Sequence, residues 1–202
     1  MMFWINMRFI SFVFVCLMFS CAKRQEVQPI PEYGLLQEFS EQIKPQTDLI
    51  LRGYGVNNYL PRGYNRTNHV ANFCVTYSLS KTRNDQVSLD EARRMVVFVV
   101  ENLLQAINSN PTIASRLEVV PCSSDRVNLR MHFEDENRVD LGQGVASVYF
   151  SRGTIKYERH DLSKCTGALF TEGEYVLVLE EPYADALEIV KQQGGLVSIA
   201  KH

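Results

Sequence analysis

The sequence has almost no excess charge of either sign, because 21 lysine and arginine residues nearly balance 23 aspartate and glutamate residues. The formal net charge of −2 gives the chain no general electrostatic reason to bind nucleic acid, and we expect no nucleic-acid partner. A long hydrophobic run is also missing, since the apolar stretch 9–19 is too short to cross a bilayer comfortably. Hydrophobic residues still make up 46% of the chain, which excludes a wholly disordered protein.

The signatures of the common enzyme sites are missing too. The chain has no H-E-x-x-H zinc motif, no G-x-S-x-G nucleophile elbow and no Walker-type phosphate loop. Gly142-Gln-Gly144 lacks the third glycine of a dinucleotide fingerprint, and the lack of a C-x-x-C pair disfavours a thioredoxin-like site. We therefore predict no catalytic residue, no metal site and no cofactor, and we favour a non-catalytic protein.

The N-terminus has the pattern of an export signal. Arg8 precedes the apolar stretch 9–19, and a cation in this place keeps the positive end of the segment inside the cell. Ser20 and Cys21 follow, so a small residue stands directly before a cysteine. This segment resembles the lipobox of bacterial lipoproteins, although Phe19 stands where the family usually has a small residue.

The resemblance implies a signal peptide over residues 1–20 and a mature chain that begins with an acylated, palmitate-bearing Cys21. Two or more acyl chains on one residue anchor a protein firmly to a bilayer. Ala22 after the cysteine is similar to the outer-membrane sorting pattern of Gram-negative lipoproteins, which implies the periplasmic side of that membrane. Residues 21–32 are polar and end in Pro-x-Pro, so we expect an extended tether.

Three other interpretations of this segment stay open. Ser20 and Ala22 also fit a small-x-small pattern, so cleavage after Ala22 would release a soluble secreted protein. The segment could instead stay uncut, with Phe3 to Phe19 as a membrane anchor. Cys21 could also be an ordinary residue of a hydrophobic tail.

Residues 33–202 have the pattern of a single α+β domain. Alternating apolar residues predict strands, and a helical spacing together with a Ser88 to Glu91 capping box predicts a long helix after Ser88. The predicted strands are 48–53, 71–80, 126–133, 145–150, 154–157 and 174–179, and the other predicted helices are 33–43, stopped by Pro45, and one opened by Pro182. We expect an antiparallel sheet of about five strands with two main helices packed on one face.

Three cysteines lie in the predicted domain. Cys122 and Cys165 fall in loops and are the preferred disulfide pair for an exported chain, although connectivity does not follow from sequence. Cys74 lies within a predicted strand, where we expect a small buried apolar residue.

Two groups of residues offer loose catalytic hypotheses. His132 and Glu134 would lie on one face of a strand, and His160, Asp161 and Cys165 could form a nucleophile set. Neither group has the spacing of a known metal or triad signature, so we interpret the histidines as neighbours of surface acids.

The segment 52–69 is the main candidate for a binding patch. It interleaves arginine and tyrosine, which bind well at low entropic cost and are common in binding loops. The patch residues are Arg52, Tyr54, Tyr59, Arg62, Tyr64 and Arg66. The competing interpretation is a long connection whose rings pack on the sheet.

The favoured function is therefore an envelope lipoprotein with a non-catalytic binding or structural domain. Its partners would be the lipid bilayer, through acylated Cys21, and an envelope protein or a glycan. The alternatives are a membrane-tethered envelope hydrolase and a secreted soluble protein.

Overall fold

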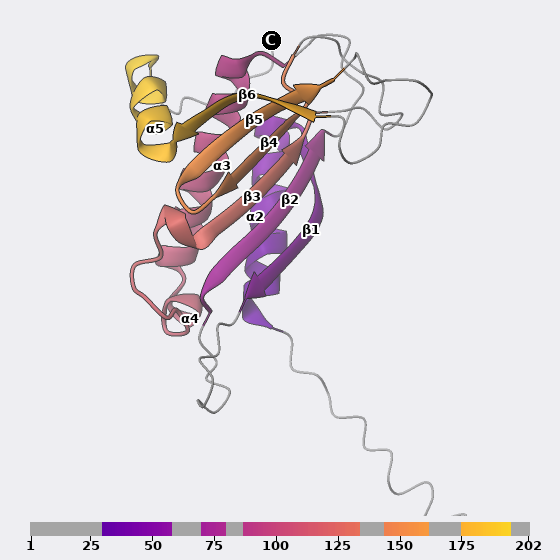
Figure 1. Ribbon diagram of the computed structural model, residues 1–202. Coiled ribbons are helices and arrows are strands. Elements are labelled where there is room, and N and C mark those ends of the chain that lie inside the picture. The colour runs from indigo at the N-terminus through magenta and orange to yellow at the C-terminus, as the bar shows by residue number, and fades with distance from the viewer. Residues whose placement is uncertain (1–29, 58–69, 80–86, 134–143, 162–174, 195–202) are drawn as a thin grey trace, which may run out of the picture.

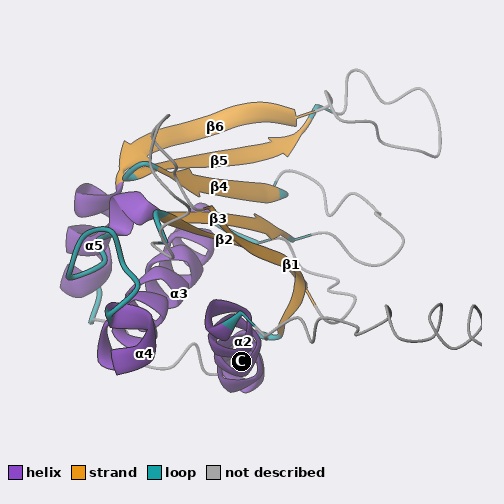
Figure 2. Ribbon diagram, turned by 90° about the horizontal axis from the view of Figure 1, so that it is seen from below, coloured by secondary structure: helices purple, strands orange, loops and turns teal. Residues whose placement is uncertain are grey.

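A single sheet with helices on one of its faces forms the fold of this computed structural model (Figure 1). The structure describes residues 30–57, 70–79, 87–133, 144–161 and 175–194. Figure 2 shows the helices grouped on one side of the sheet, and no described helix covers the other side. The predicted α+β single domain with helices on one face is confirmed.

The sheet has six strands that lie side by side in chain order. They are β1 (Leu49–Asn57), β2 (Asn72–Leu79), β3 (Val127–His132), β4 (Ser147–Ser151), β5 (Thr154–His160) and β6 (Tyr175–Pro182). Neighbours are antiparallel except β2 and β3, which are parallel. The sheet therefore has six strands where about five were predicted, and one pair is parallel in a sheet that was predicted to be antiparallel. This pair is parallel because a long helix returns the chain to the end of the sheet at which β2 began.

Four α-helices and one 3-10 turn complete the described residues. They are α2 (Pro31–Thr47), α3 (Leu89–Ser109), α4 (Pro111–Ala114), η1 (Ser124–Arg126) and α5 (Tyr183–Gln192). No helix among the described segments is long and apolar enough to span a membrane. Helix α2 packs against β1 and α3, and α5 packs against α3, so α3 lies in the middle of the helical layer.

Helix α3 begins as the sequence predicts. The hydroxyl oxygen of Ser88 accepts a hydrogen bond from the amide of Glu91 at 3.2 Å, which satisfies one of the free donors of the first turn. All six residues from Met95 to Val100 are buried, because the helix is covered by the sheet and by its two helical neighbours.

Helix α2 runs past the proline that was predicted to stop it. Pro45 lies inside the last turn, and the helix ends at Thr47. A proline there costs only one hydrogen bond near a terminus, and other bonds close the helix end. The hydroxyl of Thr47 donates to the carbonyl of Ile43, and the amide of Asp48, in a left-handed conformation, donates to the carbonyl of Lys44.

The hydrophobic core lies between the sheet and the helices. Strand residues alternate between the two faces, and the apolar ones point to the helical layer. In the central strands these are Phe73, Val75 and Tyr77 of β2, Val127, Leu129 and Met131 of β3, and Val148 and Phe150 of β4, each at most 2% exposed.

A buried polar network joins α3 to β6, the edge strand at the opposite side of the sheet from β1. The guanidinium of Arg93 donates to both carboxylate oxygens of Glu181, at 2.8 and 3.1 Å. The phenol of Tyr157 donates to the same carboxylate at 2.7 Å, and Arg93 also donates to Asp90 at 2.6 Å. Arg93, Tyr157 and Glu181 are all buried, so these groups satisfy one another where water cannot.

We predict that Arg93→Met destabilises the fold strongly. The substitution keeps an unbranched side chain but leaves the buried carboxylate of Glu181 without its cation, which costs about 3–5 kcal/mol. Urea unfolding followed by circular dichroism measures the loss. The matched control is Arg94→Met, at an exposed position on the same helix, which should change stability by less than about 0.5 kcal/mol. Equal effects of the two substitutions would contradict the role of the network.

We also predict that stability falls in alkali. Burial raises the pKa of Tyr77 from 10.0 to about 12, against the lowering effect of its hydrogen bond with Ser40. The unfolded chain therefore loses this proton first, and the free energy of unfolding decreases as pH rises from 10.0 towards 12. In Tyr77→Phe the decrease should be shallower by up to about 1.4 kcal/mol per pH unit. Urea unfolding across this range tests the prediction, and parallel curves for the two proteins would refute it.

Candidate functional site

The sheet face opposite the helices carries mostly polar side chains. The alternation that buries Phe73, Val75 and Tyr77 turns the intervening residues of β2 outward, and β3 and β4 follow the same pattern. The outward side chains of these three strands are Asn72, Cys74, Thr76, Ser78, Asn128, Arg130, His132, Ser147, Tyr149 and Ser151. No described helix covers them, so this open face is the natural place for a ligand.

A groove of about 800 Å³ lies on this open face. It runs over β2, β3 and β4 and ends near the turn that follows β4. Six of the side chains that line it are Asn57, Cys74, Asn128, Arg130, Tyr149 and Arg152. We name this feature the sheet groove.

Hydrogen bonds hold the floor of the sheet groove in place. The side-chain amide of Asn128 donates to the sulfur of Cys74 at 3.6 Å, and that of Asn57 donates to the same sulfur at 3.8 Å. Such bonds to sulfur are weak. The hydroxyl of Ser151 donates to the carbonyl oxygen of Asn128 at 2.5 Å, so both ends of this amide are oriented by neighbours.

The sheet groove contains more positive than negative charge. Arg130 and Arg152 are exposed, and neither forms an ion pair within the described part of the chain. Asp125 is the one acidic side chain in the lining, and it has nearby partners in Arg126, at 3.8 Å, and the hydroxyl of Ser123. The groove therefore offers two guanidinium groups in an otherwise slightly acidic protein.

Further charges on the same face are already paired. Lys156 of β5 stands beside Tyr149 in the register of the sheet and forms an ion pair with Glu180 at 3.2 Å. The carboxylate of Glu158 accepts a hydrogen bond from Ser147 at 2.9 Å. Arg52 is another cation on this face, but it does not line the groove and it donates to the hydroxyl of Ser78. The cations that line the groove are therefore Arg130 on β3 and Arg152 in the turn after β4.

The predicted binding patch is only partly described, and its two described members point to opposite faces. Arg52 stands at a bulge in β1 and donates to the hydroxyl of Ser78 on the open face, whereas Tyr54 packs edge-on against Tyr33 of α2. The structure therefore does not bring Arg52 and Tyr54 into one surface. The other four members, Tyr59, Arg62, Tyr64 and Arg66, lie outside the described residues.

The loose catalytic hypotheses gain no support from the described residues. His132 lies partly buried on the open face, and His160 is 3% exposed, with its ring stacked on Tyr175 at 4.8 Å between centroids. Glu134 and Cys165, which complete the two groups, fall outside the described residues. Within those residues, no three histidine, cysteine, aspartate or glutamate side chains are grouped so that they could hold a metal ion.

The cysteines differ from the prediction. Cys74 was expected to be buried, but it is a partly exposed free thiol on the open face, because the alternation of β2 turns it away from the core. Cys122 is a buried free thiol that packs into the core. Cys165 lies outside the described residues, so its pairing with Cys122 stays a prediction.

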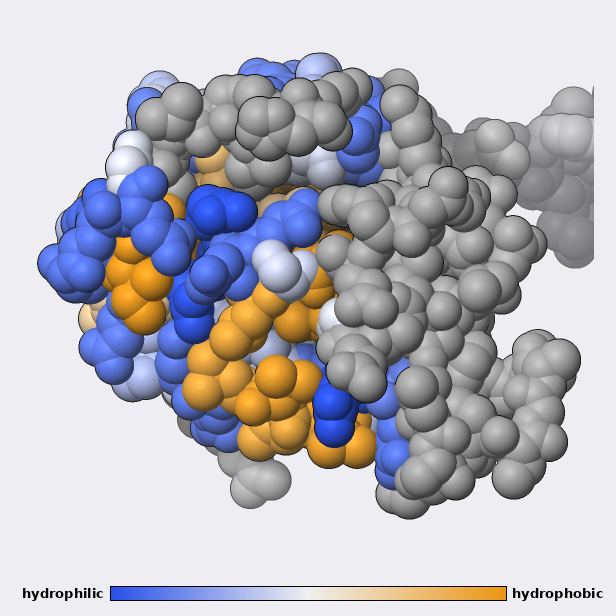
Figure 3. Space-filling model, turned by 90° about the horizontal axis from the view of Figure 1, so that it is seen from above, coloured by the Kyte–Doolittle hydropathy of each residue, from blue (hydrophilic) through white to orange (hydrophobic). Residues whose placement is uncertain are grey.

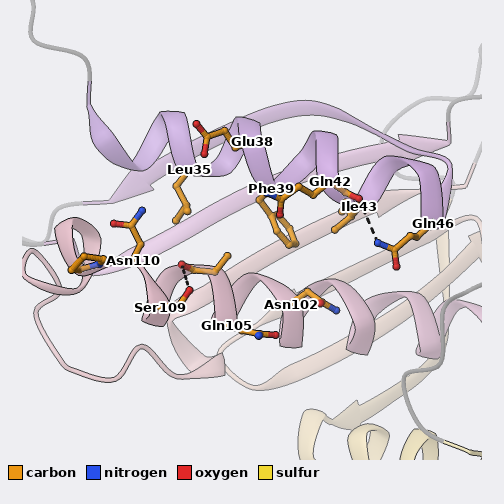
Figure 4. Close-up of a pocket in the computed structure, with 12 residues that line it drawn as sticks. Leu35, Glu38, Phe39, Gln42, Ile43, Gln46, Asn102, Gln105, Ser109 and Asn110 are labelled. Atoms are coloured by element: carbon orange, nitrogen blue, oxygen red, sulfur yellow. Dashed lines mark hydrogen bonds between the residues drawn. The ribbon is translucent and has the colours of Figure 1, made fainter.

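A second groove, of about 530 Å³, lies between α2 and α3 (Figure 4). Its lining is rich in side-chain amides, but many of their hydrogen bonds stay within the helices. Asn102 donates to the carbonyl of Phe98, Gln46 donates to that of Gln42, and Asn110 caps α4. The residues that line this groove include no lysine, arginine or histidine, so the groove has no cationic side chain for a ligand, unlike the sheet groove.

A patch of exposed apolar side chains lies along β6 (Figure 3). Val176, Leu177 and Val178 are 37%, 52% and 44% exposed on this edge strand. Val178 is the extra residue of a bulge opposite Tyr157 and Glu158, and Pro182 ends the strand. A bulge and a proline hinder the addition of another strand, so this edge is protected against simple sheet extension.

Sequence reasoning missed the residues of the sheet groove. Arg130 and Tyr149 stand opposite each other in the register of β3 and β4, although 19 positions separate them in the chain. The sequence did contain a sign of their position, because both residues alternate with apolar residues in predicted strands and so belong on the face opposite the core. It could not be used without knowing that β3 and β4 pair and that none of the described helices covers this face.

We predict that Cys74 reacts with thiol reagents far faster than Cys122. Burial raises the pKa of Cys122 to about 11, so little thiolate is present near neutral pH, and its sulfur is also shielded. Brief treatment of the folded protein with N-ethylmaleimide, followed by peptide mass mapping, should label Cys74 first. Labelling after denaturation is the control, in which both cysteines should react. Equal rates in the folded protein would contradict the described burial.

Comparison with known proteins gives no match, whether to a family model, to a curated protein or to a solved structure.

Proposed function

We propose that this protein is a lipoprotein of the bacterial cell envelope, held at a membrane by acyl chains on Cys21, whose folded domain binds a partner without catalysing a reaction. In a Gram-negative cell the proposed location is the periplasmic side of the outer membrane. The domain would bind through its open sheet face rather than through its helices.

The anchor is supported by the order of segments along the chain. Arg8, the apolar stretch 9–19 and the pair Ser20-Cys21 follow one another without a gap. The polar residues 22–29 then come before Ile30 and the start of α2 at Pro31. A lipid-anchored domain needs such a spacer, because the acylated residue must reach the bilayer while the folded part stays in water.

The binding role is supported by the polarity of the open face. Polar side chains can face water on an open sheet without loss of stability. The fold alone, however, does not require two arginines that have no ion-pair partner among the described residues to lie around an exposed tyrosine. Arg130, Arg152 and Tyr149 line one groove, and residues of these types are enriched where proteins bind partners. This cluster on the open face is the observation that carries the binding proposal.

We predict that Cys21→Ser abolishes acylation and membrane retention. Serine keeps the size of the side chain but removes the thiol to which the diacylglyceryl group is attached by a thioether. Intact mass of the wild-type protein from the membrane fraction should show a chain that starts at Cys21 and carries acyl groups. The variant should be unacylated, and its uncleaved or soluble forms should appear in fractionation.

The matched control is Cys16→Ser, which changes a cysteine inside the apolar stretch and should leave acylation intact. Two outcomes would refute the anchor. A mature wild-type chain that starts at Lys23 indicates a soluble secreted protein, and a full-length unmodified chain in the membrane indicates an uncut N-terminal anchor.

A further inference from the structure

We propose that the sheet groove binds an acidic saccharide, meaning a sugar chain that carries carboxylate groups. The inference deepens the proposed function and depends on its claim that the domain is a binding module. It names the ligand class that the described side chains fit best.

The charge of the groove selects an anion. Arg130 and Arg152 are exposed and have no acidic partner within the described residues, while Asp125 has Arg126 and Ser123 beside it. A planar guanidinium forms two parallel hydrogen bonds with a carboxylate, which gives orientation as well as affinity. Two such groups in one groove suit a ligand with repeated negative charges.

The backbone of the groove argues against an extended peptide. Peptides that bind to sheets usually add a strand at a free edge, where unpaired main-chain groups recognise them. The sheet groove lies mainly over β2, β3 and β4, and each of these strands is paired on both sides. It reaches the edge strand β1 only at Val56 and Asn57, which pair with Phe73 and Asn72 of β2. Over most of the groove, therefore, only side chains can contact the ligand, so the ligand must bring hydrogen-bonding groups that fit side chains.

The remaining lining suits a sugar. Tyr149 is 39% exposed, and its ring offers an apolar face to the C–H groups of a pyranose, while its hydroxyl can bond a sugar hydroxyl. Asn57, Asn72 and Thr76 add amide and hydroxyl groups along the groove. The volume of about 800 Å³ falls within the range of pockets that hold small organic ligands, so a short oligosaccharide fits.

Titration calorimetry on the full-length protein tests the ligand class. The probes are oligosaccharides of galacturonate, mannuronate and glucuronate, the same oligosaccharides with their carboxyl groups reduced to alcohols, and an oligoglutamate peptide. At least one acidic saccharide should bind at least about tenfold more tightly than its reduced form and than the peptide. Its affinity should also fall in about 0.5 M salt.

Variants locate the site. Arg130→Gln and Arg152→Gln remove one charge each at exposed positions, so the fold should persist while binding of the acidic saccharide weakens about tenfold. Arg94→Gln makes the same charge change on the exposed side of α3 and should have no effect. Bound saccharide should also slow the alkylation of Cys74, whereas an unrelated site would leave that rate unchanged.

Several outcomes would overturn the inference. These are equal affinity for the reduced saccharide, tighter binding of the peptide, no binding of any acidic saccharide, or an equal loss of affinity in Arg94→Gln. The mass of Cys21 separates this inference from the anchor. An acylated protein that binds no acidic saccharide refutes the ligand class alone, whereas a binding protein without acylation refutes the anchor alone.

Discussion

The packing of α3 against one face of the sheet is the constraint on which the rest of this structure depends. The run from Met95 to Val100 has no polar side, so it must be enclosed by the sheet and by helices. Burying each of these large side chains contributes roughly 1.5–3 kcal/mol, far more than an exposed ion pair does. The central strands therefore orient their apolar residues towards α3, and their polar residues are left on the other face.

Local signals predicted most of the fold. The alternation of Phe73, Val75 and Tyr77 fixed one strand and the face that it buries, and the Ser88 to Glu91 capping box fixed the start of the long helix. The predicted strands 145–150 and 154–157 are joined by a tight turn at Arg152-Gly153, in which both residues have a positive φ. The parallel pairing of β2 with β3 was not predicted, because it depends on where α3 returns the chain. Pro182 is both the last residue of β6 and the N-cap of α5, so it precedes the helix by one position instead of taking its first turn.

The candidate site was much harder to predict than the fold. Sequence reasoning favoured Arg52 to Arg66, where arginine and tyrosine are close neighbours in the chain. Residues that are close in a strand share a face only if they alternate regularly, however, and the bulge in β1 turns Arg52 and Tyr54 to opposite faces. Arg130, Tyr149 and Arg152 come from different elements, and only the register of β3 with β4 brings the first two opposite each other. Cys74 was misjudged for a related reason, since its apolar neighbours mark the opposite face.

The attachment end of the domain has a consequence for its orientation. Glu32, buried at the start of α2, forms an ion pair at 2.8 Å with the partly exposed Arg116. The carbonyl of Arg116 accepts a hydrogen bond from the amide of Val70, next to the end of the β1–β2 pair at Asn57. The sheet groove includes Asn57, so it lies at the end from which the chain leads back towards Cys21. A fully extended chain from Cys21 to Ile30 spans roughly 30 Å. If Cys21 is embedded in a bilayer, this length limits how far the groove end of the domain can lie from the lipid surface, while the strand ends at His132 and His160 lie at the opposite end of the sheet.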